Sequence, residues 1–259
     1  TPLYVLDAPL AFTRQGGPYQ DAAGQDYMDN AQRFAVLSQV AARLASPDSP
    51  LEWRPDLLHC NDWQTGLAPA YLNFLGRPVP SVITVHNLAY QGIFPPSTVP
   101  RLGLPAESFS IQGVEYYRNL SFLNAGLYYA DRITTVSPTY AEEIQREPLG
   151  MGMQGLLATR KADMCGILNG IDTGDWNPSS DLHLPGAYSL RAPSGKKRCK
   201  QKLQEEMGLD QEADAPLFGL IARMTHQKGL DLVLAVAEGI IQRGGQLIML
   251  GTGDKDLEQ

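Results

Sequence analysis

Three segments of the chain place polar or charged side chains directly after a run of apolar residues. In the first, residues 57–60 lead into Asp62. In the second, residues 81–85 lead into His86 and Asn87. Open α/β sheets bind ligands at the carboxyl ends of their strands, so a carboxylate, an imidazole and an amide at two such ends favour one pocket rim. Two unrelated helix caps are the alternative, because Asp62 also stands where a capping carboxylate would precede a helix.

The third segment carries positive charge where an anion could bind. Residues 218–222 form an apolar run, Arg223 follows it, and Lys228 stands five residues later at the start of a predicted helix. The free backbone N–H groups and the dipole of a helix start already favour an anion. Together these features suit a pyrophosphate, and two ordinary surface cations are the alternative.

Apolar runs that alternate with helical patterns must position these residues. Such alternation is typical of βαβ units around parallel sheets and predicts an α/β fold. Apolar spacing predicts helices over residues 34–44 and 232–241, each with one stripe for packing on a sheet, and a shorter helix over 200–207. Because predicted strands open and close the chain, we expect a fragment of a longer protein. The strands are predicted near Leu3–Asp7, Asp56–Cys60, Ser81–His86, Arg132–Val136, Cys165–Leu168, Leu217–Ala222 and Leu247–Leu250.

The composition excludes several classes of protein. The chain has 259 residues, of which 43% are hydrophobic and 19% charged, as is ordinary for a folded protein of one or two domains. Its net charge of −7 leaves no positive field to attract nucleic acid. The longest strongly apolar run, Leu247–Leu250, is far shorter than the ~20 residues of a membrane span. No basic segment followed by an apolar one opens the chain, so no signal peptide is expected.

The cysteines and histidines argue against disulfides and metals. Cys60, Cys165 and Cys199 are odd in number and widely spaced, which fits neither a disulfide framework nor a zinc site and favours a reducing cytoplasm. The four histidines show no helical pairing and no cysteine partner, so no metal is expected.

A glycine pattern in the middle of the chain has the spacing of a dinucleotide-binding loop. The pattern is Gly150-Met-Gly152-Met-Gln-Gly155. Such a loop directly follows a strand, whereas a helix-like segment, residues 140–146, and Pro148 precede this one. An NAD-dependent oxidoreductase is therefore disfavoured, and no cofactor is expected.

Six motifs stand in order along the chain: Asp62-Trp63, Val85-His86-Asn87-Leu88-Ala89-Tyr90-Gln91-Gly92, Ala125-Gly126-Leu127-Tyr128-Tyr129-Ala130-Asp131, Thr135-Val136-Ser137-Pro138-Thr139-Tyr140-Ala141, Leu168-Asn169-Gly170-Ile171-Asp172 and Gln227-Lys228-Gly229-Leu230-Asp231-Leu232. Their sequence resembles the family of bacterial glycogen synthases and plant starch synthases, glycosyltransferase family 5. The resemblance runs through nearly all 259 residues, in the family's order, which makes chance implausible.

The resemblance implies two Rossmann-like domains that face a cleft, both incomplete in this chain. Residues 1–165 would be the C-terminal part of the N-terminal, acceptor-side domain, and residues 166–259 the start of the C-terminal, nucleotide-sugar-binding domain. It further implies transfer of glucose from ADP-glucose to the non-reducing end of an α-1,4-glucan such as glycogen, with retention and without a metal. A catalytically inactive glucan-binding or regulatory homologue and a UDP-glucose-dependent glycosyltransferase are the alternatives.

By the same resemblance, one group of residues would contact the donor. Arg223 and Lys228 would hold its diphosphate and neutralise the charge that grows there as the glycosidic bond breaks, with Gln227 beside them. His86 would contact the donor glucose and help stabilise its cationic transition state.

A second group would line the sugar and acceptor subsites. The resemblance assigns this role to Asp62, Asn87 and Tyr19, and it implies that Asn169 faces the cleft from the start of the second domain. A retaining enzyme can use a carboxylate as its nucleophile, which would be Asp62. The family is described as reacting on one face of the sugar without a covalent intermediate, so that role is not expected.

Two positions depart from the family pattern, and two motifs are missing. Asn61 stands where the family often has a histidine, and Gln64-Thr65 stands where it often has His-Ala. The family's Lys-x-Gly-Gly-Leu loop and its Glu-Pro-Cys-Gly-Leu segment, which contact the donor, lie outside these residues. We therefore expect an incomplete active site and an inactive fragment.

Overall fold

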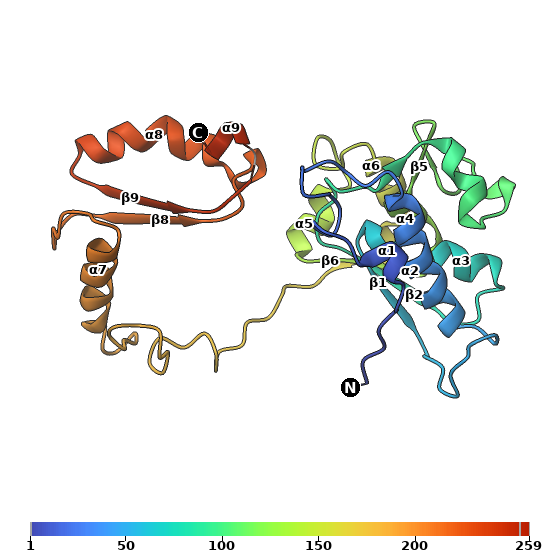
Figure 1. Cartoon of the computed structure of the whole chain (residues 1–259), viewed down its shortest axis with the longest axis horizontal. Coiled ribbons are helices and arrows are strands. Elements are labelled where there is room, and N and C mark those ends of the chain that lie inside the picture. Colours follow the sequence, from blue (N-terminus) through green and yellow to red (C-terminus); the bar gives the residue numbers. More distant parts are fainter. Residues whose placement is uncertain (1, 254, 259) are drawn as a thin grey trace. The chain divides into compact units, whose positions relative to one another are not determined.

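Figure 1 shows the computed structural model of the chain, which describes residues 2–253 and 255–258. The chain forms two compact units that divide between Asn169 and Gly170. Each unit contains a parallel sheet and its own helices. The predicted α/β fold class is confirmed, while the assignment of residues 1–165 and 166–259 to two domains of the family stays a prediction.

The first unit is built on a four-stranded parallel sheet in the order β1-β2-β6-β7. Its register pairs Asn61 with Thr84 and Thr84 with Thr134, so the strands end at a common edge. Along β2, Ser81, Ile83 and Val85 are buried while Val82 and Thr84 between them are partly exposed, as the alternation of a strand requires. The strands are β1 (Leu58–Asn61), β2 (Ser81–Val85), β6 (Arg132–Thr135) and β7 (Met164–Gly166).

One hydrophobic core joins this sheet to the surrounding helices. Phe34 of α2, Leu72 of α3 and Phe122 of α4 are buried in the same cluster as Ile83 and Ile133 of the sheet. The helices of this unit are α1 (Pro9–Phe12), α2 (Asn30–Leu44), α3 (Ala68–Phe74), α4 (Phe122–Tyr129), α5 (Pro138–Glu143) and α6 (Gln154–Thr159), with short 3-10 helices η1 (Trp63–Thr65), η2 (Pro96–Leu102), η3 (Ala106–Ser108) and η4 (Lys161–Asp163).

Serine residues fix the starts of two helices near the strand ends. Ser121 Oγ accepts a hydrogen bond from the N–H of Asn124 at the start of α4, and Ser137 Oγ accepts one from the N–H of Tyr140 at the start of α5. Pro138 occupies the first position of α5, where its missing N–H costs nothing. Each cap ties the first turn of its helix to the residue directly before the helix.

A small antiparallel sheet was not predicted from the sequence. Its strand order is β3-β5-β4, and all three strands belong to the segment between β2 and α4. Strands of two or three residues give no readable alternation, which is why the pattern of apolar residues missed them. The strands are β3 (Ile93–Phe94), β4 (Glu115–Tyr116) and β5 (Asn119–Ser121).

The strand predicted over Leu3–Asp7 is wrong. Residues 2–8 have no regular structure, and the side chains of Leu3 and Val5 are 86% and 79% exposed. Tyr4 stacks on Trp53 with ring centroids 6.0 Å apart. No described strand pairs with this segment, and an extended backbone without a ladder partner does not form a sheet.

The second unit contains a two-stranded parallel sheet, β8 (Leu217–Ile221) and β9 (Gln246–Leu250), connected by α8 (Leu230–Gln242). Figure 1 shows α8 running along this sheet. The predicted apolar stripe of α8 is only partly covered: Val233 is half-buried, while Leu232 and Val236 are exposed. A sheet of two strands is too narrow to cover the whole apolar stripe of α8, so part of the stripe stays exposed. The other elements are α7 (Gly195–Glu206), η5 (His226–Lys228) and α9 (Lys255–Glu258).

Within the described part of the chain, no helix has the length and apolar content that crossing a bilayer requires.

Candidate functional site

Asp62 and His86 lie side by side at the carboxyl ends of β1 and β2. The backbone N–H of Asp62 donates to the carbonyl oxygen of Thr84 at 2.9 Å, which extends the strand pairing by one residue. Asp62 Oδ1 then accepts the backbone N–H of His86 at 2.8 Å. The Asp62 side chain makes no capping bond to η1, which begins at Trp63. The carboxylate therefore serves the neighbouring strand end and not the helix that follows it.

The backbone of Asp62 is in a conformation that L residues rarely adopt. Its φ is 52° and its ψ is −168°, a region populated almost only by glycine. A non-glycine residue there costs on the order of 1–3 kcal/mol, and such residues cluster at functional sites. This backbone conformation directs the half-buried carboxylate across the strand ends, where the hydrogen bond from His86 holds it.

The imidazole of His86 is exposed and contacts one neighbour on β1. Its Nε2 lies 3.0 Å from Oδ1 of Asn61. Sequence reasoning treated Asn61 only as a departure from the family pattern, and it assigned this side chain no role. The amide orients the ring while leaving its exposed face open to a ligand.

The loop after β2 is fixed from a second direction by α5. Tyr140 Oη accepts the backbone N–H of Leu88 at 3.0 Å, and Asn87 Oδ1 accepts the N–H of Ala89 at 3.0 Å. Burial raises the pKa of Tyr140 and the negative charge of Asp62 adds to the shift, so the hydroxyl stays protonated in neutral solution. Sequence reasoning missed Tyr140, although it stands in one of the six motifs.

Tyr19 reaches the same strand end through the residues that follow Asp62. Its ring lies 5.8 Å from that of Trp63, and its hydroxyl accepts a 2.6 Å hydrogen bond from Nε2 of Gln64. Gly92 makes room for this arrangement, because a Cβ at its positive φ of 58° would lie 2.5 Å from the Trp63 ring. Tyr19, Asp62, His86 and Asn87 are thus brought to one edge of the first unit.

Asn169 is not joined to these residues. It lies in the exposed segment after β7, at the last position of the first unit. Its side chain forms no hydrogen bond with any residue that the structure describes. Its proposed role therefore rests on the family resemblance alone.

The second unit gathers Arg223, Gln227 and Lys228 between β8 and α8. Arg223 follows the end of β8 by two residues, and Lys228 ends η5 directly before Gly229, the residue that precedes α8. All three side chains are exposed. Neither cation forms an ion pair with another residue among 2–253 and 255–258, so both charges are available to an anion.

No described group of three or more His, Cys, Asp or Glu side chains is arranged to hold a metal ion.

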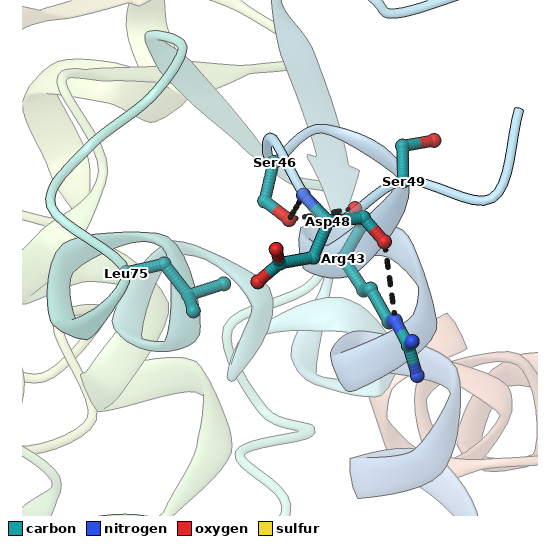
Figure 2. Close-up of a pocket in the computed structure, with 5 residues that line it drawn as sticks. All are labelled: Arg43, Ser46, Asp48, Ser49 and Leu75. Carbon is teal, nitrogen blue, oxygen red and sulfur yellow. Dashed lines mark hydrogen bonds between the residues drawn. The ribbon is translucent and has the colours of Figure 1, made fainter. Parts of the chain in front are cut away.

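Figure 2 shows an open depression lined by Arg43, Ser46, Asp48, Ser49 and Leu75, and it contains none of the predicted site residues. It lies at the C-terminal ends of α2 and α3, the helices that lead toward the amino ends of β1 and β2. The strand-end residues are therefore a separate feature of the unit.

The chain matches known proteins. Residues 1–159 match the starch synthase catalytic domain family. This match covers more than half of the chain, and the chain belongs to that family.

The comparisons also give particular relatives. The chain is 57% identical over 259 residues to a glycogen synthase of Nitrosomonas europaea, covering 100% of this chain and 52% of the relative. A glycogen synthase of Paramagnetospirillum magneticum is 54% identical over 260 residues, with 99% and 52% covered. The chain spans about half the length of these curated relatives.

A solved structure is similar as well. It is the catalytic domain of starch synthase IV from Arabidopsis thaliana bound to ADP and acarbose. The TM-score is 0.83 and the sequence identity 28%, and the match covers 97% of this chain and 51% of that one.

Proposed function

We propose that the protein containing this chain is a glycogen synthase, which transfers glucose from ADP-glucose to the non-reducing end of an α-1,4-glucan with retention. The structural observation that carries the proposal is the pair of exposed cations, Arg223 and Lys228, at the end of β8. Support comes from the 57% identity to a glycogen synthase and from the similarity to a starch synthase that binds ADP and acarbose. A diphosphate leaving group and an oligosaccharide acceptor are consistent with both of these similarities.

In this proposal the second unit handles the leaving group. Arg223 and Lys228 bind the diphosphate of ADP-glucose, and Gln227 lies beside them. As the bond between glucose and phosphate breaks, negative charge grows on the diphosphate. Preorganised cations stabilise that charge more in the transition state than in the ground state, which accelerates the reaction.

The first unit handles the sugar. The exposed imidazole of His86 contacts the donor glucose and stabilises its cationic transition state, and Asp62, Asn87 and Tyr19 line the sugar and acceptor subsites. Asp62 Oδ1 is engaged by the N–H of His86, which leaves Oδ2 for a sugar hydroxyl. We assign residues 1–165 to the acceptor-side domain and residues 166–259, including Asn169, to the nucleotide-sugar side.

The same proposal places the protein in the cytoplasm. Cys60, Cys165 and Cys199 are all free thiols in the structure, as a reducing compartment permits.

The experiment is transfer of labelled glucose to glycogen by the full-length protein, with ADP-glucose and UDP-glucose compared at equal concentrations. We expect incorporation from ADP-glucose in strong preference to UDP-glucose, and an α-anomeric product by NMR. Preference for UDP-glucose would overturn the assigned donor. Binding of glycogen without transfer from either donor would overturn the enzymatic assignment in favour of an inactive glucan-binding homologue.

A further inference from the structure

Arg33, on the first turn of α2, is a buried cation that forms no ion pair with a carboxylate of the described residues. The residue is only 4% exposed. Arginine is almost never buried to this extent unless it is paired. Among the described residues no Asp or Glu forms a salt bridge with Arg33, and Asp29, just before the helix, pairs with Arg14 instead. The guanidinium must therefore be held by other groups.

Three oxygens and three aromatic rings hold it. Arg33 Nε donates to the carbonyl oxygen of Ala11 at 2.6 Å. Its Nη1 donates to the carbonyl oxygen of Pro18 at 3.0 Å and to Asn30 Oδ1 at 2.5 Å. The guanidinium carbon also lies 4.8 Å from the ring centre of Tyr27, a distance at which a cation and an aromatic ring attract. The rings of Phe12 and Phe34 lie slightly farther away.

These contacts fasten segment 11–29, which comprises the end of α1 and the residues between α1 and α2, to α2, and they converge on Tyr19. Pro18, whose carbonyl Arg33 binds, is the residue before it. Asn30 forms the second link: its Oδ1 accepts from Arg33 while its Nδ2 donates to the carbonyl oxygen of Tyr19 at 2.9 Å. Arg33 thus holds the carbonyl group of Pro18 directly and the carbonyl group of Tyr19 through Asn30.

The far end of Tyr19 contacts the strand edge described above. Its hydroxyl accepts from Gln64 and its ring packs against Trp63, the two residues that directly follow Asp62. A continuous set of hydrogen bonds and ring contacts therefore runs from Arg33 through Asn30 and Tyr19 to the exit of β1.

We propose that Arg33 is a positioning residue for the glucan acceptor: it does not touch substrate but holds Tyr19 where the acceptor binds. The proposal rests on the proposed function, because it uses the acceptor role assigned to Tyr19. It predicts that loss of Arg33 weakens binding of the glucan and leaves the nucleotide sugar and the chemical step largely unaffected.

Lysine cannot replace this arginine. The planar guanidinium presents donors in two directions, which lets it bind Ala11 and Pro18 at once. A lysine has all its donors on one nitrogen and cannot span the same oxygens in the same geometry. Arg33→Lys thus keeps the charge but loses the fork, and Arg33→Met keeps the apolar stem among the rings but loses all the donors.

The test uses these two variants in the full-length protein, with Arg43→Lys as the matched control. Arg43 lies on the same helix, ten residues further along, and its Nε donates to the carbonyl oxygen of Asp48 (Figure 2). For Arg33→Lys we expect the KM for glucan to rise about 10-fold, as for loss of one hydrogen bond from a charged group. The KM for ADP-glucose and kcat should stay within about 2-fold, as for a residue that acts on acceptor binding alone. The control should leave all three unchanged.

A double-mutant cycle separates positioning from general destabilisation. If Arg33 acts through Tyr19, Arg33→Lys should add little to the glucan KM of a Tyr19→Ala variant. Effects that multiply independently would overturn the link to Tyr19. Should the Arg33 variants fail to fold, Asn30→Ala breaks the bridge to Tyr19 while leaving the buried charge in place, and the same rise in glucan KM is expected.

A second readout does not depend on transferase activity. Chymotrypsin cleavage after Tyr19 or Tyr27, followed by mass spectrometry well below the melting temperature, reports how firmly segment 11–29 is held. Faster cleavage in Arg33→Lys than in Arg43→Lys supports the positioning role even if the full-length protein proves inactive, and equal cleavage overturns it. Faster cleavage with an unchanged glucan KM would overturn the acceptor assignment.

Discussion

The carboxylate of Asp62 binds the backbone, not the imidazole, of His86: Oδ1 accepts the His86 N–H at 2.8 Å. Two consequences follow from this relationship. The strand ends are tied together in a way that does not depend on the histidine side chain. Among the residues that the structure describes, the imidazole itself forms one hydrogen bond, with Asn61, and it is otherwise exposed. The roles of the two residues can therefore be separated by mutation.

The strained backbone of Asp62 predicts an unusual order of stability. Asp62→Ala loses the bond to His86 and keeps the strain at φ 52°. Asp62→Gly loses the same bond but releases strain worth about 1–3 kcal/mol, against about 0.5–1 kcal/mol for the extra entropy of glycine. We expect the glycine variant to be more stable than the alanine variant by about 1 kcal/mol. If Asp62 lines the sugar subsite as proposed, both variants should lose turnover, because both lack the carboxylate.

Arg77 provides the control for this prediction. It also has a positive φ, of 54°, and it has no proposed role in the reaction. Thermal unfolding of the full-length protein should rank Arg77→Gly above Arg77→Ala, with turnover unchanged in both. If Asp62→Ala melts at or above the temperature of Asp62→Gly, the strain does not exist in solution.

His86→Ala should separate structure from chemistry. The backbone bond to Asp62 survives the change and the side chain is exposed, so the melting temperature should hardly move. If the imidazole stabilises the transition state, turnover should fall on the order of 100-fold. His59→Ala is the matched control. His59 lies on β1, its side chain is exposed like that of His86, and its Nε2 forms a hydrogen bond with Oγ1 of Thr84. Unchanged turnover in His86→Ala would remove this residue from the site.

Tyr140→Phe tests how the loop after β2 is held. The N–H of Leu88, a fully buried residue, loses its acceptor, which costs about 1–3 kcal/mol. Hydrogen exchange measured by mass spectrometry should show faster exchange in peptides that contain residues 86–90. Tyr128→Phe is the control, because the Tyr128 hydroxyl forms no hydrogen bond within the described part of the chain. Equal exchange in both variants would contradict the bond.

The sequence predicts the elements of the fold well where long-range pairing is not needed to read them. β2 and β8 follow from apolar runs, and α2 from its helical stripe. Leu3–Asp7 has an equally apolar pattern, but a strand also needs a partner, and the sequence does not say whether one is present. The small sheet β3-β5-β4 was missed for a different reason: its strands are too short to give a pattern.

The candidate site divides in the same way. The positions of Asp62 and His86 could be predicted because each directly follows a strand, and the parallel register brings the two strand ends together. The contacts that hold these residues in place could not be predicted. Gln64 and its partner Tyr19 are 45 positions apart, and Tyr140 and Leu88 are 52 apart. Arg33 and Ala11 are separated by 22 positions. Such contacts are set by packing, and no local spacing encodes them.

Lys228 is the residue at which local geometry and the proposed chemistry can be tested most directly. It ends η5 one residue before Gly229, whose left-handed φ of 68° turns the chain into α8. If its charge acts mainly on the diphosphate in the transition state, Lys228→Gln in the full-length protein should lower kcat and kcat/KM together. Loss of one preorganised contact of this kind costs on the order of 100- to 1,000-fold. A ground-state anchor would instead raise the KM for ADP-glucose and leave kcat unchanged.

Two further variants complete the test of Lys228. Lys228→Arg should restore only part of the rate, because a planar guanidinium does not occupy the place of a compact ammonium. Lys202→Gln is the control: Lys202 is an exposed lysine of the same unit, on α7, and its Nζ bonds Glu205. Its removal should leave kcat and KM as they are. An unchanged kcat in Lys228→Gln rejects the transition-state role, and unchanged kcat and KM together reject Lys228 as a site residue.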